Sequence, residues 1–164
     1  MYNAAVITVS DKGSLGQRED LSWKEIIKIL KEAKIYTVSE YIIIPDERDI
    51  ISKNLKEIAD EKKADIIFTT GGTGFSKRDV TPEATKDILE KETPGISEAI
   101  RAYSMTITPR AMLSRAASGI RKDTLIINLP GSPKAVRESL EYILPSLSHG
   151  LNILLGREAE CGQK

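Results

Sequence analysis

The chain has 164 residues, the size of one ordinary domain, and a chain of this length buries roughly 70% of the surface that its unfolded form exposes. Lysine and arginine number 24 and aspartate and glutamate also 24, so no net charge draws the protein to nucleic acid or to an anionic membrane. The one cysteine excludes a disulfide framework, and no run reaches the roughly 20 apolar residues of a membrane span. We therefore expect a soluble, cytoplasmic protein that binds neither nucleic acid nor membranes.

The first part of the chain alternates β-rich runs with segments of helical period. Strands are predicted over 4–10, 37–44 and 64–70, where β-branched and apolar residues cluster. Helices are predicted over 22–33 and about 51–59, because apolar residues recur there every three or four positions: Trp23, Ile26, Ile27 and Leu30, then Ile51, Leu55, Ile58 and Ala59.

The second part of the chain continues the alternation less clearly. The order Thr81-Pro82-Glu83 is typical of a helix start, with threonine as N-cap and proline in the first turn, so we predict a helix to about Glu90. One or two short helices are expected over 93–120, where proline and glycine interrupt a weak period. A buried strand over 124–130 precedes a helix that Pro145 is expected to kink or restart; the apolar face of this helix is Val136, Leu140, Ile143, Leu144, Leu147, Leu151, Leu154 and Leu155.

This alternation predicts a mostly parallel sheet with helices on both faces. The fold class is therefore α/β: a single three-layer, doubly wound domain over 1–164, with a polar tail at 156–164 that we expect to be flexible. In such sheets, ligands bind beyond the carboxyl ends of the strands. Polar or small residues follow all four main strands: Ser10 and Asp11, Pro45 and Asp46, the segment 69–79, and Pro130 to Pro133.

The third of these segments contains GGTGFSKRD, residues 71–79, which we call the glycine loop. It fails the P-loop pattern, because Lys77 lies three positions after Gly74 and Arg78 replaces the hydroxyl residue. The dinucleotide pattern G-x-G-x-x-G also fails, since its third glycine falls on Lys77. Closely spaced glycines still let backbone N–H groups approach phosphate oxygens, so the loop is suited to an anion.

Two carboxylates suggest a metal ion in the same place. Asp79 would repel a bound phosphate unless a cation stood between them, and Mg²⁺ is commonly held by one or two carboxylates together with substrate phosphates. Asp46, which follows the preceding strand, is the candidate second ligand. The alternatives are a solvated loop acid or cap for Asp79, and a turn acid or helix N-cap for Asp46.

The motif TTGGTG followed by RDVTPEAT, with IPDE before it and SRAASGIRKDTLIINLPGSPKAV after it, resembles the molybdopterin adenylyltransferase (MoaB/Mog) family, which includes the G domain of gephyrin. The resemblance covers about Ala4 to Leu155 in the same order. It implies the compact α/β fold of that family and assembly into trimers or hexamers. It also implies Mg²⁺-dependent transfer of AMP from ATP to the terminal phosphate of molybdopterin, release of pyrophosphate, and hand-over of the product to a metal-insertion enzyme.

The resemblance also implies roles for individual residues. The two aspartates that the family needs for catalysis and metal binding match Asp46 and Asp79. Its substrate-binding positions match Gly71, Gly72 and Gly74 in the nucleotide-phosphate loop, Thr73 and Ser104 near the pterin, Asn128, Pro130 and Gly131 in a second nucleotide-side loop, and Ser10 and Asp11 at the pocket edge. One departure is Trp23, which replaces a small residue and is expected to be a core anchor or a subunit contact.

The chemistry of the residues agrees with this reaction. A phosphate monoester has its second pKa at about 6, so the attacking group is already ionised and needs no strong general base. Three functions stay open: the transferase, an inactive molybdopterin-binding or scaffold relative, and a nucleotide-dependent enzyme unrelated to pterins. The presence of both Asp46 and Asp79 favours the transferase, because a binding protein has no need of two carboxylates beside a polyphosphate.

Overall fold

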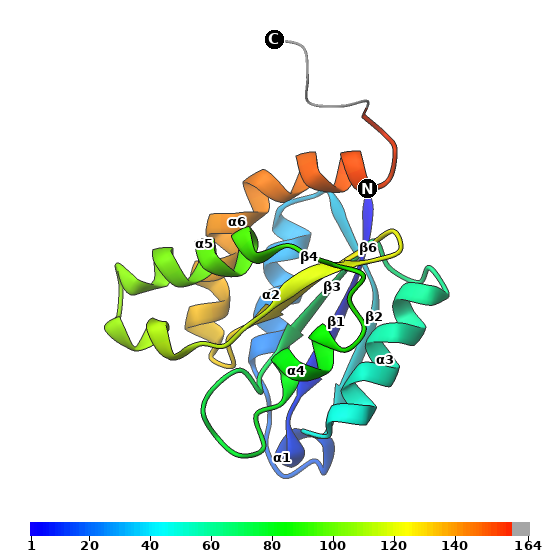
Figure 1. Ribbon diagram of the computed structural model, residues 1–164. Helices are drawn as coiled ribbons and strands as arrows, with labels where there is room; N and C mark the ends of the chain where they lie inside the picture. Colours follow the sequence, from blue (N-terminus) through cyan, green and yellow to red (C-terminus); the bar gives the residue numbers. More distant parts are fainter. Residues whose placement is uncertain (159–164) are drawn as a thin grey trace.

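The computed structural model describes residues 1–158, so the rest of the tail expected at 156–164 lies outside the described residues. One six-stranded sheet, in the order β2–β1–β3–β6–β5–β4, forms its centre (Figure 1). The strands are β1 (Tyr2–Val9), β2 (Tyr36–Ile44), β3 (Ile66–Thr70), β4 (Lys91–Glu92), β5 (Ser118–Arg121) and β6 (Thr124–Leu129).

The sheet is mostly parallel, as predicted. Strands β2, β1, β3 and β6 run in the same direction, while β5 and β4 form an antiparallel edge. From β1 the chain goes to the edge strand β2 and then returns to β3 on the other side of β1, so the strand order reverses between β1 and β3. Ligands in open α/β sheets bind at such a switch point.

Helices cover both faces and enclose two apolar cores, which confirms the three-layer α/β class. One face carries α2 (Ser22–Glu32), α5 (Pro94–Met105) and α6 (Pro133–Leu154); the other carries α3 (Arg48–Asp60) and α4 (Thr81–Lys86). The central strands β3 and β6 are buried along their whole length, which is why both are continuous apolar and β-branched runs. Two short elements complete the fold: α1 (Asp11–Ser14) and the 3₁₀ helix η1 (Pro109–Leu113).

The segment 93–120 contains two short helices, α5 and η1, as expected, and also a strand, β5, that was not expected. Pro94 begins α5 instead of interrupting it, and β5 was not predicted. β5 carries Gly119 against Leu89 and the carbonyl of Lys91, where an added Cβ would find no room. A four-residue strand with serine, glycine and arginine has no apolar period, so its sequence carries no strand signal.

The predicted N-cap and end of α4 were wrong, and of the two expectations at Pro145, a kink or a restart, the structure excludes the restart. The N-cap of α4 is Val80, and the Thr81 hydroxyl donates instead to the Gly71 carbonyl at 3.0 Å; α4 also ends at Lys86 and not near Glu90. α6 runs as one helix through Pro145, so no restart occurs there. Within residues 1–158, no helix combines the length and apolar character needed to cross a membrane.

Candidate active site

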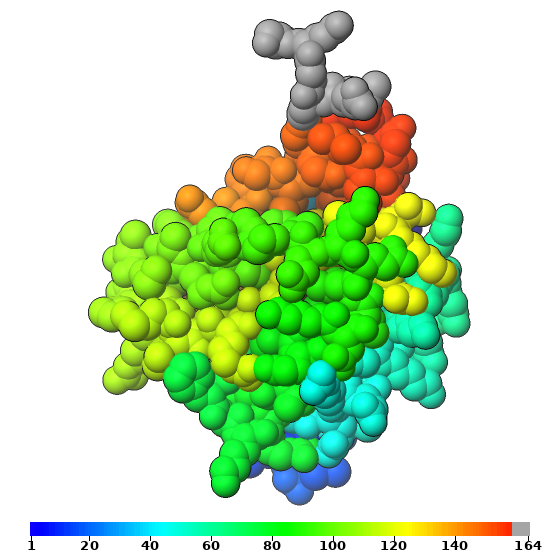
Figure 2. Space-filling view, in the orientation of Figure 1, coloured from blue at the N-terminus to red at the C-terminus, as the bar shows by residue number. Residues whose placement is uncertain are grey.

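Three loops meet at one edge of the sheet, beyond the carboxyl ends of β1, β2 and β3. They are α1 after β1, the turn before α3, and the glycine loop after β3. Figure 1 shows α1 and the glycine loop together at the bottom of the view. In the space-filling view, the blue surface of α1, the cyan start of α3 and the green glycine loop adjoin (Figure 2). The strand-end loops thus lie together, as the fold class predicts.

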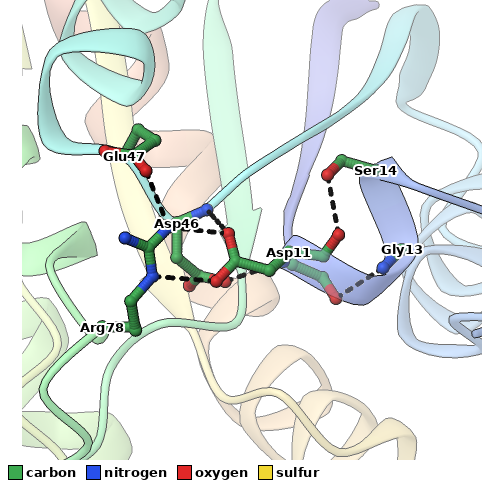
Figure 3. A network of polar contacts seen from close by, with 7 residues as sticks. Asp11, Gly13, Ser14, Asp46, Glu47 and Arg78 are labelled. Carbon is green, nitrogen blue, oxygen red and sulfur yellow. Dashed lines mark hydrogen bonds and ion pairs between the residues drawn. The ribbon is translucent and has the colours of Figure 1, made fainter. Parts of the chain in front are cut away.

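Asp11 and Asp46 hold two of these loops to each other (Figure 3). The backbone N–H of Asp11 donates to Asp46 Oδ2 at 2.9 Å, and the N–H of Asp46 donates to Asp11 Oδ1 at 3.0 Å. Ser10 stabilises the same turn, because its hydroxyl caps α1 by accepting from the Gly13 N–H at 3.0 Å. The reciprocal pair fixes where the Asp46 carboxylate stands relative to β1.

Arg78 ties the glycine loop to this pair. Its guanidinium donates to both carboxylate oxygens of Asp11, each at 2.9 Å, and to Glu47 Oε1 at 2.7 Å. The hydrogen bond from Arg78 lowers the pKa of Asp11, so this carboxylate stays ionised. Arg78 therefore acts as a bridge across the edge of the site.

Asp46 and Asp79 are the carboxylates that the sequence singled out for a metal ion. Burial raises the pKa of Asp46, and the negative charges of Asp11 and Asp79 raise it further. Asp79 Oδ2 accepts the Ser76 N–H at 2.9 Å. A divalent cation near Asp46 and Asp79 would relieve their repulsion, so this donor set fits Mg²⁺. No group of three or more metal-ligating side chains occurs in residues 1–158, so such a cation would need phosphate or water as further ligands.

The glycine loop is too tight for side chains at Gly71 and Gly72, and a side chain at Gly74 would displace the Asp79 carboxylate. Gly71 has φ +95 and would drive a Cβ into the Val9 carbonyl; Gly72 has φ +69 and would drive one into Thr81 Oγ1. At Gly74 a Cβ would stand 2.9 Å from Asp79 Oδ2. The glycines therefore let the backbone lie directly against β1, α4 and the carboxylate.

A crevice of about 240 Å³ opens at the β1/β3 switch point; Glu19 and Asp20 are the acids in its lining, which does not include Asp46 or Asp79. Ser10 and Gly71 line it, so it adjoins Asp11 and Gly72, the next residues in the chain. Gly131, after β6, forms another wall, and its carbonyl accepts the Ser22 hydroxyl at 2.6 Å. The crevice has the position expected for a nucleotide or pterin phosphate.

Trp23, the departure from the family pattern, does not line this crevice. Its ring stacks on Tyr41 with centroids 4.3 Å apart, and it packs against the apolar core under α2. Trp23 therefore has a packing role directly behind Leu21 and Ser22, which line the crevice.

Of the candidate residues, Ser10, Gly71 and Gly131 line the crevice, and the others, among them Thr73, Ser104, Asn128 and Pro130, do not. Asn128 is fully buried: its amide donates to Thr69 at 3.0 Å and to Thr85 at 2.9 Å, and its oxygen accepts the Ala117 N–H at 3.1 Å. Thr73 is also buried. Ser104 and Pro130 line a second cavity of about 230 Å³, where the Ser104 hydroxyl has no hydrogen-bond partner among the described residues.

Sequence reasoning missed Arg115, whose side chain contacts the glycine loop at two carbonyls. Arg115 lies in the quoted stretch SRAASG, but no role was assigned to it, because it stands in an irregular segment between η1 and β5. Only the tertiary structure shows that the carbonyls of Asp79 and Gly74, 36 and 41 positions away, accept hydrogen bonds from the same guanidinium.

Known proteins resemble this chain over nearly its whole length. Residues 5–149 match the family model described as "Probable molybdopterin binding domain". The molybdopterin adenylyltransferase of Helicobacter pylori J99 is 44% identical over 160 residues, which cover 97% of this chain and 91% of the relative. Gephyrin of Dictyostelium discoideum is 43% identical over 91% of this chain, which spans 22% of gephyrin.

Solved structures agree with these matches. The molybdopterin biosynthesis enzyme MoaB from Thermus thermophilus superposes with a TM-score of 0.88 and 45% identity, over 95% of this chain and 98% of that one. The tungsten cofactor synthesizing protein MoaB from Pyrococcus furiosus gives 0.84 and 38%, over 94% and 97%. The match of fold, chain length and sequence is consistent across them, and the chain belongs to the family of this probable molybdopterin binding domain.

Proposed function

We propose that this protein is a molybdopterin adenylyltransferase, which transfers AMP from ATP to the terminal phosphate of molybdopterin and releases pyrophosphate. Relatives that bear this name cover nearly the whole chain. The observation that carries the proposal is the pair Asp46 and Asp79, whose charges interact and whose carboxylates lie against Gly72 and Gly74 of the glycine loop. A polyphosphate with a divalent cation is the ligand that this combination suits.

The reaction asks for positioning and charge stabilisation more than for a general base. A terminal phosphate oxygen of molybdopterin attacks the α-phosphorus of ATP, the bond to the β-phosphate oxygen breaks, and pyrophosphate leaves. That oxygen is already ionised, because the second pKa of a phosphate monoester is about 6. The backbone of the glycine loop would bind phosphate oxygens through its N–H groups.

Asp46 and Asp79 are the residues that would hold Mg²⁺. When bound, the ion supplies positive charge to the triphosphate and to the departing pyrophosphate. Asp11 would remain paired with Arg78 and keep the Asp46 backbone in place. Asp11 would thus have a structural role, Asp79 would bind the metal, and Asp46 would do both, because its Oδ2 also accepts the Asp11 N–H.

The decisive experiment measures pyrophosphate release from ATP and Mg²⁺ with and without molybdopterin. Asp46→Asn and Asp79→Asn should each lower the rate by more than the roughly 10–100-fold typical of residues that only support metal ligands. Asp49→Asn, an exposed acid on the first turn of α3, is the matched control and should keep the wild-type rate.

Other outcomes would identify the alternatives. Wild-type protein that binds molybdopterin without releasing pyrophosphate would be an inactive molybdopterin-binding or scaffold relative. Release that ignores the pterin would indicate a nucleotide-dependent enzyme of another kind.

We also propose that copies of this chain assemble into a trimer or hexamer. Exposed apolar side chains gather where α5 meets η1: Met105, Ile107, Met112 and Leu113. Contiguous apolar surface of this kind marks contact sites. Analytical ultracentrifugation should give three or six copies for the wild type and fewer for the double variant Met112→Lys, Leu113→Glu; a monomeric wild type would refute the assembly.

Two further proposals concern the cell. The use of ATP supports a cytoplasmic location, and an adenylylated pterin still lacks its metal, which supports hand-over to a metal-insertion enzyme. Whether that enzyme accepts the product can be measured by supplying it with the product, alone and still bound to this protein.

A further inference from the structure

We infer that Arg115 is a positioning residue that fixes the glycine loop and, through it, the Asp79 carboxylate. The consequence for catalysis rests on the function proposed above. The positioning itself is a property of the chain and can be tested without substrates.

Arg115 contacts both ends of the exposed part of the loop. Its Nε donates to the Gly74 carbonyl at 2.8 Å, and its Nη2 donates to the Asp79 carbonyl at 2.7 Å. Its own backbone N–H donates to the Thr73 carbonyl at 2.9 Å. The four residues between these anchors, 75–78, are all exposed. One side chain therefore closes a segment that has little packing of its own.

The contacts explain why the residue is an arginine. A guanidinium has five N–H donors in a rigid plane, so it can reach two carbonyls and a carboxylate in different directions at once. The carboxylate is Glu83 of α4, which pairs with Nη1 and balances the charge of Arg115. A lysine ammonium is a single point and cannot make all three contacts in this geometry.

The fixed backbone determines where the Asp79 carboxylate lies. Asp79 Oδ2 accepts the Ser76 N–H within the loop and lies against Gly74, where an added Cβ would stand 2.9 Å from it. A shift of the Gly74 or Asp79 backbone would therefore move the carboxylate. Arg115 bonds the Asp79 carbonyl and makes no contact with its carboxylate, so it acts by position.

The segment that carries Arg115 is itself bonded to the central sheet. Two residues beyond Arg115, the N–H of Ala117 donates to Asn128 Oδ1, and the N–H of Asn128 donates to the Ala117 carbonyl at 3.0 Å. Asn128 is in turn held by Thr69 and Thr85. Through this network, Asn128 has a structural role, because it anchors the segment that carries Arg115 to the central strand β6.

A matched control lies at the other end of β5. Arg121 makes the same kind of fork, to both carboxylate oxygens of Asp60 at 2.8 Å and to the Ile88 carbonyl at 3.0 Å. Arg115→Lys and Arg121→Lys keep the charge and each break one fork. If Arg115 only stabilised the fold, Arg115→Lys and Arg121→Lys should give the same exchange rates in the glycine loop and the same Mg²⁺ dependence of pyrophosphate release.

The first measurement is amide hydrogen exchange, which needs no ligand. In Arg115→Lys, exchange should accelerate in peptides covering 71–81, where the N–H groups of Ser76, Asp79 and Thr81 are hydrogen-bonded. Arg121→Lys should leave these peptides at the wild-type rate. Unchanged exchange of 71–81 in Arg115→Lys would overturn the inference. Arg115→Gln, which can still bond one carbonyl, replaces this variant if it does not fold.

The second measurement is the Mg²⁺ dependence of pyrophosphate release. In Arg115→Lys, half-saturation should require roughly 10–100-fold more Mg²⁺, as for residues that support metal ligands. Arg121→Lys should match the wild type. If Arg115→Lys also matches it, Arg115 has no positioning role in catalysis. If the wild type released no pyrophosphate, the proposed transferase function would be refuted instead. Hydrogen exchange would then still decide whether Arg115 positions the glycine loop.

Discussion

At the scale of single residues, Gly72 is the tightest point between the glycine loop and the carboxylates. It has φ +69, and an added Cβ would collide with Thr81 Oγ1 and stand 3.2 Å from Asp46 Oδ1. We expect Gly72→Ala to lower the free energy of unfolding by about 1–3 kcal/mol and to remove pyrophosphate release. Urea denaturation and the activity assay measure the two effects.

Gly95 is the control for that substitution. It is exposed in the first turn of α5, and nothing lies within 4 Å of an added Cβ. Gly95→Ala should keep activity and gain up to about 0.5–1 kcal/mol of stability, because alanine loses less entropy in a helix. Equal behaviour of the two alanine variants would mean that the loop has room which the structure does not show.

The ionised Asp46 carboxylate is expected to lower the free energy of unfolding of the protein without ligand. Burial and two neighbouring carboxylates disfavour its charge, as the raised pKa indicates. Asp46→Asn removes the charge and keeps an oxygen for the Asp11 N–H. We expect a higher thermal midpoint at pH 7 in the absence of Mg²⁺, together with lost activity. A lower midpoint than that of wild type, measured by calorimetry, would contradict this account.

At the scale of elements, the ion pair of Arg121 on β5 with Asp60 on α3 predicts a pH dependence. The hydrogen bond from Arg121, with help from Lys122, lowers the pKa of Asp60 to about 2. A lowered folded-state pKa means stability that is present above about pH 4 and disappears as the pH falls towards 2. Asp60→Asn should therefore unfold at a lower temperature than wild type at pH 6, and the difference should shrink near pH 2.

A neighbouring acid tests whether that dependence is specific. Asp123 makes only an exposed contact with Lys62 at 3.5 Å, and such pairs contribute little. Asp123→Asn should differ little from wild type at either pH. If both variants lost the same amount of thermal stability at pH 6, the cause would be surface charge in general, and the Arg121–Asp60 pair would have no special contribution.

The elements that the sequence predicted are those with strong apolar period. α2, α3, β3 and β6 were found where expected, because each buries a continuous stripe or run. β5 was missed, since it exists to pair with β6 and buries little apolar surface of its own. α6 extends over the predicted apolar face without a restart, because packing of this face on the core outweighs the lost hydrogen bond at Pro145.

The residues of the candidate site also divide into those that the sequence predicted and those that it could not predict. Motif reasoning named Asp46, Asp79 and the glycines, and strand-end placement brings their loops together. Arg115 stands in the quoted family motif, but its role could not be predicted, because its partners are backbone carbonyls 36 and 41 positions away. Asn128 was assigned to the nucleotide side by resemblance, whereas the structure buries its side chain in a network with Thr69 and Thr85.

At the scale of the whole molecule, the two ends of the sheet differ in how their charged side chains are arranged. At one end, Arg121, Asp60 and Lys122 fasten β5 to α3. At the other, short helices and loops carry several carboxylates around a crevice. Two apolar cores between these ends hold the strands rigid, so the carboxyl edge can hold like charges close together without loss of the fold. The molecule is therefore expected to gain most stability from a ligand that neutralises this edge.

That expectation can be measured as a shift in thermal unfolding. A ligand that binds only the folded state stabilises it by about 2.7 kcal/mol at 100 times its Kd. For a chain of this length, each kcal/mol raises the midpoint by about 2–4 °C, so Mg²⁺ with ATP should raise it by about 5–10 °C. ATP with a chelator should give a much smaller shift, because the carboxylates then repel the triphosphate. Asp79→Asn should likewise lose most of the shift with Mg²⁺; a shift of wild-type size in that variant would place the nucleotide away from the glycine loop.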